Sequence, residues 1–173
     1  MHRFTIALAA AAIALPALAQ PASLTVDLKG PAGEDMGVAT LTEGPRGVLL
    51  RVEGRGLKPG WHGLHFHQKG DCSGPDFKSA GSHVHDQDAA VHGLFNPAAN
   101  EAGDLPNVWA TSVGIVNAEV FTTWVSLTGA EGRPALLDAD GSALVIHAGP
   151  DDHASQPIGG AGARVACAVI KAP

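Results

Sequence analysis

The sequence predicts an all-β fold, a Greek-key β-barrel or sandwich formed as a single domain with two long functional loops. Short runs of alternating or β-branched residues are separated by Gly, Pro, Asn and Asp, which is the pattern of strands and turns. No segment carries a sustained helical period. The stretch 70–107 is too long for a bare connection in a compact domain, so we expect it to be functional.

Residues 1–19 are expected to form a secretory signal peptide. Arg3 precedes an alanine-rich apolar run that ends near Leu15, and Ala17 and Ala19 supply the small residues that signal peptidase accepts. The apolar run is about a dozen residues, shorter than the ~20 that a membrane-spanning helix requires. We therefore expect residues 20–173 to form a domain without a membrane span, exported to a bacterial periplasm.

The first strands are expected at 24–28, 37–42 and 47–52. The first alternates polar and apolar residues, and the other two are rich in β-formers on either side of a turn at 44–47. Later strands are expected at 108–115, 119–127, 143–147 and 164–170, where similar runs recur between turn residues.

A strand between them, ending at His67, carries the first chemical signal. In the run Leu64-His65-Phe66-His67, apolar and polar residues alternate. The two histidines therefore share one face of the strand, while Leu64 and Phe66 point into the core. Copper and zinc favour neutral imidazole ligands. A histidine pair on a strand is more often only solvent-facing. Further histidines, however, lie in the long loop and at the end of the strand at 143–147 (His83, His85, His92 and His147), which makes a metal site the first hypothesis.

The only two cysteines, Cys72 and Cys167, predict a disulfide in an oxidising compartment. It would tie the long loop to the last strand, and closing so long a loop restricts the unfolded chain by at most about 4.7 kcal/mol in the entropy model. Free buried thiols or metal ligands are the alternatives, although neither cysteine belongs to a C-x-x-C motif.

The charge of the chain excludes one class of partner. The formal net charge is −6, which argues against a general affinity for nucleic acid or anionic membranes.

Five motifs in order give the chain a resemblance to a known family. They are 60–67 (GWHGLHFH), 79–83 (SAGSH), 103–107 (GDLPN), 143–147 (ALVIH) and 160–170 with its arginine and cysteine. The chain resembles the copper/zinc superoxide dismutases, in their bacterial periplasmic branch. The resemblance implies an enzyme that converts superoxide into dioxygen and hydrogen peroxide with a redox-cycling copper ion beside a structural zinc ion. It also allows a homodimer.

Carried over position by position, the resemblance implies four copper ligands, His65, His67, His83 and His147, with His83 bridging to zinc and serving in catalysis. It implies that the zinc side takes His83, His92 and Asp104. Arg164, three residues before Cys167, resembles the family's arginine that docks the superoxide anion. Asp151 resembles the aspartate that hydrogen-bonds one copper ligand and one zinc ligand, here His65 and His92.

One ligand that the family pattern requires is missing. The family has a zinc-binding histidine three residues before the zinc aspartate, and this chain has Glu101 there. Because zinc takes four N, O or S ligands, either His85, which we slightly favour, or Glu101 could complete the site. A third alternative is a copper-only dismutase without zinc, and a fourth is a non-catalytic copper-binding module.

Overall fold

The chain forms nine β-strands and two short 3-10 helices within residues 22–85 and 89–172, which are described by a computed structural model. The strands are β1 (Ser23–Lys29), β2 (Asp35–Gly44), β3 (Gly47–Gly54), β4 (Gly60–His62), β5 (Leu64–His67), β6 (Val108–Ala110), β7 (Val116–Thr122), β8 (Ser142–His147) and β9 (Arg164–Ile170). The 3-10 helices are η1 (Lys78–Ala80) and η2 (Ala130–Gly132). The expected signal peptide lies outside the described residues.

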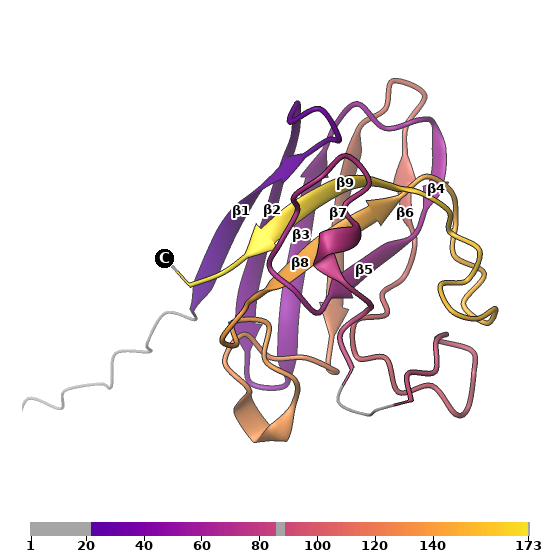
Figure 1. Cartoon of the computed structure of the whole chain (residues 1–173). Helices are drawn as coiled ribbons and strands as arrows, with labels where there is room; N and C mark the ends of the chain where they lie inside the picture. Colours follow the sequence, from indigo (N-terminus) through magenta and orange to yellow (C-terminus); the bar gives the residue numbers. More distant parts are fainter. Residues whose placement is uncertain (1–21, 86–88, 173) are drawn as a thin grey trace, which may run out of the picture.

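The strands form one curled antiparallel sheet and a short ladder that joins its edges. The sheet has the order β5-β8-β9-β1-β2-β3-β7, and β4 pairs with β6. Because β4 runs into β5 through Gly63 and β6 leads into β7, the ladder connects the two edge strands (Figure 1). This confirms the predicted all-β barrel-like fold.

Alternation along the strands produces the main core. In β3, Val48, Leu50 and Val52 are fully buried while Leu49 and Arg51 face solvent. Leu28 of β1 and Leu41 of β2 join them in one apolar cluster. Burying such side chains stabilises the fold by about 1.5–3 kcal/mol each.

Strands β5 and β8 are buried on both faces. Phe66 of β5 and Leu144 of β8 pack into the main core, whereas Val145 packs on the other face into a second cluster with Phe77 and Cys167. That second face is covered by the connection from β5 to β6, which passes in front of β8 and β9 in Figure 1. Any polar residue on this face of β5 is therefore enclosed between sheet and loop.

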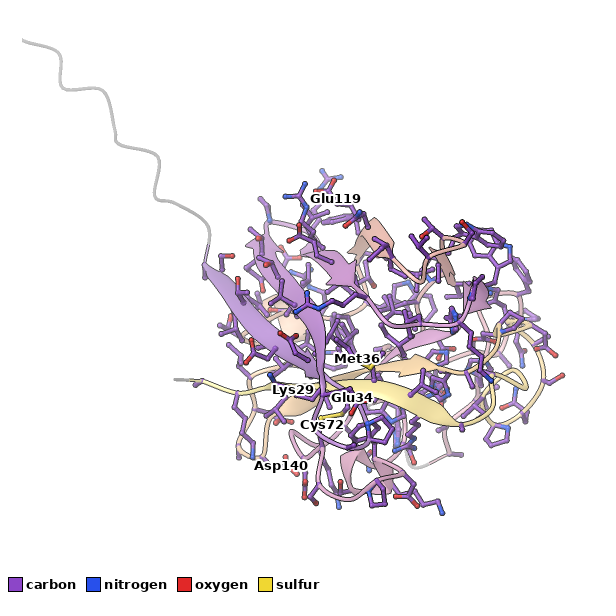
Figure 2. All side chains as sticks on the ribbon, turned by 90° about the horizontal axis from the view of Figure 1, so that it is seen from above. Lys29, Glu34, Met36, Cys72, Glu119 and Asp140 are labelled. Atoms are coloured by element: carbon purple, nitrogen blue, oxygen red, sulfur yellow. A yellow bond between two sulfur atoms is a disulfide. The ribbon has the colours of Figure 1, made fainter. Side chains whose placement is uncertain are left out.

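The predicted disulfide is confirmed. Cys72 and Cys167 are bonded with their Cα atoms 5.9 Å apart and 95 residues apart in sequence. Figure 2 shows Cys72 beside β9, so the bond fastens the start of the long connection to that strand.

Two strand predictions were wrong in their limits. The run 108–115 forms a strand only over β6, because the Thr111 amide donates to the Ile115 carbonyl oxygen and closes a turn that contains Gly114. The strand expected at 119–127 is β7 and begins earlier, at Val116; it ends at Thr122. In the described residues, no helix is long and apolar enough to cross a membrane.

Candidate metal centre

Two groups of buried side chains meet under the long connection and share two histidines. The ligand atoms in each group lie within 4.8 Å of one another. The first group, which we call the imidazole cage, is His65, His67, His83 and His147. The second is His65, His83, His92 and Asp104.

Main-chain pairing brings the imidazole cage together from three segments. His65 and His67 lie on β5, which pairs with β8 and so lies beside His147 at the end of that strand. His83 forms an isolated antiparallel bridge with His67. The cage is therefore fixed by sheet hydrogen bonds on one side and by the loop on the other.

Hydrogen bonds to carbonyl and carboxylate oxygens set the tautomers of three cage histidines. His67 Nδ1–H donates to the Gly81 carbonyl oxygen (2.9 Å), and His147 Nδ1–H donates to that of Gly162 (3.0 Å). His65 Nε2–H donates to Asp151 Oδ2 (2.8 Å). Because these oxygens only accept, the other ring nitrogen of each histidine is left with a free lone pair.

Four ring nitrogens of the imidazole cage, one from each histidine, are buried and lack hydrogen-bond partners in the described part of the chain. They are His65 Nδ1, His67 Nε2, His83 Nε2 and His147 Nε2. Burial of an unsatisfied polar atom is costly, and four of them converging is the donor set that copper accepts. The residues present therefore fit a copper ion.

Burial keeps three of the four rings in this cage neutral. Burial lowers the pKa of His65 to about 4 and that of His147 to about 3, and it lowers the pKa of His67 well below its ordinary value. The three rings are thus unprotonated at neutral pH and hold no proton that a metal would have to displace.

The second group has a different chemistry, because carboxylates face its imidazoles. Asp104 Oδ1 lies 2.9 Å from His83 Nδ1 and 3.0 Å from His92 Nδ1, while its Oδ2 accepts from the Gly93 amide at 2.7 Å. Glu101 Oε2 approaches the same two nitrogens, at 2.8 and 3.1 Å. We call His83, His92, Glu101 and Asp104 the carboxylate cage.

Charge in the carboxylate cage shifts pKa values the other way. Burial alone would lower the pKa of His92, but its hydrogen bonds to Asp104, Asp151 and Glu101 outweigh burial and raise it to about 11. The pKa of His83 is raised in the same way, against burial, by Asp104 and Glu101. Burial opposes ionisation of Glu101 and Asp104, yet the two histidines lower the pKa of both.

His85, expected as a zinc ligand, belongs to neither group of clustered ligand atoms. Its backbone bridges to Glu101, but the residue is only partly buried and lines a separate cavity of about 280 Å³ with Gln68 and Arg133.

Asp151 joins the two cages, as the resemblance implies. Its Oδ2 accepts from His65 and its Oδ1 accepts from His92 Nε2–H at 3.0 Å, and these bonds, against the effect of burial, lower its pKa. Asn107 holds the backbone of Asp151 at both ends: the Asp151 amide donates to Asn107 Oδ1 (2.9 Å), and Asn107 Nδ2 donates to the Asp151 carbonyl oxygen (2.8 Å).

Gln156 holds His92 by the reciprocal arrangement. The His92 amide donates to Gln156 Oε1 (2.9 Å), and Gln156 Nε2 donates to the His92 carbonyl oxygen (2.8 Å). The connection from β5 to β6 and the connection from β8 to β9 are thus each hydrogen-bonded to the other through one side-chain amide. The role of neither amide was predictable from the sequence, although Asn107 belongs to the motif at 103–107, because a single Asn or Gln in a loop carries no periodic or spacing signal.

Arg164 lies beside the imidazole cage. Its Nη1 donates to the Phe77 carbonyl oxygen (2.6 Å) and its Nη2 to that of Gly81 (2.7 Å), which also accepts from His67. Burial lowers the pKa of Arg164, but guanidinium stays protonated in proteins. A fixed cation therefore stands next to the orphaned nitrogens.

Two further histidines lie near the cages. His62 is buried, with its Nδ1 2.6 Å from the His147 carbonyl oxygen and its Nε2 2.7 Å from that of Lys58. His153 is only partly exposed; it contacts Asn107 and the ring of Phe95.

Comparison with known proteins adds an independent finding. A family model described as copper/zinc superoxide dismutase matches residues 36–170. A Caulobacter vibrioides protein named superoxide dismutase [Cu-Zn] is 62% identical over 149 residues, covering 86% of both chains, and an Aquifex aeolicus protein named superoxide dismutase [Cu-Zn] 2 is 41% identical over 157 residues, covering 87% and 91%. The structure is similar to Cu/Zn superoxide dismutase from Brucella abortus (TM-score 0.68, 30% identity, 86% and 99% covered) and to a SOD-like protein from Bacillus subtilis (TM-score 0.78, 33% identity, 84% and 97% covered).

Proposed function

The chain belongs to the copper/zinc superoxide dismutase family, and on that premise we propose how its residues perform the reaction. The enzyme converts two superoxide anions and two protons into dioxygen and hydrogen peroxide, with copper and zinc as cofactors. The assignment of individual residues below is our proposal.

The imidazole cage would hold copper through His65 Nδ1 and through Nε2 of His67, His83 and His147. When bound, copper supplies the one-electron chemistry that oxidises one superoxide and reduces the next. The observation that carries this assignment is the convergence of four buried, partnerless ring nitrogens beside a cation.

His83 is proposed to manage a proton. Its Nδ1 faces the carboxylates of Glu101 and Asp104, while its Nε2 faces the other imidazoles and has no hydrogen-bond partner among the described residues. When Nε2 is not engaged by copper it can hold a proton and deliver it to the reduced substrate. If Nδ1 stays bound on the zinc side, the His83 ring would keep its position while Nε2 gains or loses its proton.

Arg164 is proposed to dock the anion. Its guanidinium is positioned by two carbonyl oxygens, which use donors on one side of the fork and leave others for a small anion. The disulfide at Cys167 restrains the same strand. Because the whole protein is acidic, this local cation would supply the attraction for superoxide.

Asp151 is proposed to orient both cages, since one carboxylate fixes the ring of His65 and that of His92. Zinc in the carboxylate cage would then order the long loop and hold His83 from the far side.

The test is metal content and superoxide turnover measured on the same purified mature protein. We expect one copper and one zinc per chain with rapid dismutation. One equivalent of copper without turnover would contradict the enzymatic assignment and leave a copper-binding module. Turnover with copper alone, unchanged on adding zinc, would instead indicate a copper-only dismutase.

We also propose a periplasmic location and a homodimer. The periplasm is supported by the expected signal peptide at 1–19 and by the disulfide. A dimer is supported by an exposed aromatic face on which Trp61 and Trp109 pair across β4 and β6, with Phe121 of β7 bordering the same hollow. Light scattering of the native protein and of Trp109→Ser tests it: a mass near one chain for the native protein contradicts the dimer.

A further inference from the structure

We propose that Glu101 is the fourth zinc ligand, so that two imidazoles and two carboxylates hold the ion. This inference rests on the proposed function, because it assumes that the carboxylate cage binds zinc. It also replaces the three-histidine, one-aspartate set that the family resemblance implies and that His85 would restore.

Short nitrogen–oxygen distances join the ligand atoms of the carboxylate cage. Each imidazole Nδ1, of His83 and of His92, lies between 2.8 and 3.1 Å from one oxygen of Glu101 and one of Asp104. A tetrahedral ion with bonds of about 2.0–2.1 Å separates its ligand atoms by roughly 3.3 Å. Binding of zinc would therefore lengthen these nitrogen–oxygen distances by only a few tenths of an ångström.

A tight turn places both carboxylates on the same site. The Asp104 amide donates to the Glu101 carbonyl oxygen (3.2 Å), so residues 101–104 form one turn of the loop. Gly103 within it donates to Val84 and accepts from Phe66, and a Cβ there would lie 2.2 Å from the Phe66 carbonyl oxygen. The turn is thereby pressed against β5, and its two acidic side chains reach the same pair of histidines.

Burial requires that the Glu101 charge be balanced. The residue is 4% exposed, and its ion pairs in the described part of the chain are with His83 and His92, the same rings that Asp104 contacts. A buried carboxylate is retained when it is paired or coordinates a metal. A divalent ion between two carboxylates gives a cage with no net charge, because the two imidazoles are neutral ligands.

His85 is poorly placed to do the same work. It pairs with Glu101 through the backbone, but it is only partly buried and lines a separate cavity with Gln68 and Arg133. Glu101 Oε2, in contrast, lies 2.8 Å from His83 Nδ1 and 3.1 Å from His92 Nδ1. To coordinate, its ring would have to enter a cage where Glu101 already contacts both histidines. The two residues thus make a matched pair of neighbours for an experiment.

Zinc affinity of the copper-loaded, full-length mature protein should be measured by competition with a chromophoric chelator. We expect Glu101→Gln, which keeps the shape and removes the charge, to bind zinc at least about 10-fold more weakly, since even partners outside the ligand set cost 10–100-fold. Glu101→His, which offers another zinc ligand, should bind within a few-fold of the native protein. His85→Ala should be unchanged, within about twofold.

Cobalt substitution gives a readout that does not depend on activity. The native protein and His85→Ala should show the same intense visible bands of a four-coordinate Co²⁺ site, and Glu101→Gln should lose or shift them. The inference is overturned if Glu101→Gln keeps native zinc affinity and cobalt spectrum, or if His85→Ala loses them. Glu101→His covers the case in which Glu101→Gln does not fold: native-like zinc affinity supports the inference, and a folded histidine variant without zinc contradicts it.

Failure of the proposed function looks different. In that case the native protein binds copper without superoxide turnover, whatever the ranking of zinc affinities. Failure of the present inference leaves an active dismutase whose zinc affinity does not depend on Glu101.

Discussion

The imidazole cage and the carboxylate cage share His83, yet they solve the problem of a buried polar cluster in opposite ways. In the imidazole cage, burial lowers the pKa values of His65 and His147 to about 4 and about 3, and the inward-facing ring nitrogens of these two residues and of His67 carry no proton. In the carboxylate cage, Asp104, Asp151 and Glu101 overcome burial and raise the pKa of His92 to about 11. The histidines that belong to the imidazole cage alone are thus neutral, whereas the shared His83 and His92 are protonated and paired with carboxylates.

This difference indicates how each cage would take up its metal. A metal ion in the imidazole cage would give partners to ring nitrogens that lack them and would displace few protons. Zinc in the carboxylate cage must instead displace protons through which the histidines already pair with carboxylates. Asp151 connects the cages mechanically, because it hydrogen-bonds one histidine on each side.

The largest effect is expected from removing a ligand of the imidazole cage alone. His147→Gln should lose copper and lower dismutation at least about 1,000-fold, because the redox chemistry belongs to the cofactor. Zinc content should stay native, since His147 does not belong to the carboxylate cage. Metal analysis and superoxide assays check this; equal loss of zinc would show that the cages are not separable.

A smaller effect on both cages is expected from Asp151→Asn. Asparagine has the same size but only one accepting oxygen in its side chain. One of the two histidines, His65 or His92, therefore loses the hydrogen bond that fixes its tautomer. Affinities for copper and zinc should each fall about 10–100-fold. The exposed neighbour gives the control Asp152→Asn, which should change neither. If only one affinity falls, Asp151 does not couple the cages.

Arg164→Gln should lower kcat/KM about 10-fold with copper content unchanged, because it removes local attraction for an anion rather than a ligand. The dependence of the rate on ionic strength should weaken in parallel. Arg51→Gln, a surface arginine on β3, is the matched control. An unchanged salt dependence in Arg164→Gln would argue that this arginine serves structure alone.

The smallest effect should come from the amide that grips the backbone of His92. Gln156→Ala removes the two hydrogen bonds to the His92 backbone, each contributing about 0.5 kcal/mol at the low end for such bonds, so zinc affinity should fall about 5-fold. Copper affinity should be native, because Gln156 hydrogen-bonds no residue of the imidazole cage in the described part of the chain. A larger loss of copper than of zinc would contradict this placement.

The fold was predictable where local pattern and tertiary environment agree. Alternation in β1, β2 and β3 identified buried positions such as Leu28 and Leu50, because one face of those strands packs on the core. The limits of β6 and β7 were not predictable, since apolar and β-branched residues continue through the turn at 111–115. There the hydrogen bond between Thr111 and Ile115 decides the path of the chain.

The site divides in the same way. His65 and His67 were found because strand periodicity places them on one face, and family resemblance supplied His83 and His147; their ligand roles stay predictions. The choice between His85 and Glu101 depended on the register of a loop that is fixed by Phe66, Gly103 and Val84. No local pattern in the sequence encodes those pairings.

The central claim is that neutral histidines of the imidazole cage lie beside protonated histidines of the carboxylate cage. Counting the protons released on metal binding tests it most directly. At pH 6 the raised pKa values leave His83 and His92 protonated in the metal-free protein, while His65 and His147 are neutral. Calorimetric titration with zinc in two buffers of different ionisation enthalpy should give a release of about two protons per zinc bound, and zinc affinity should rise with pH. Zinc binding without proton release, and with pH-independent affinity, would contradict the account.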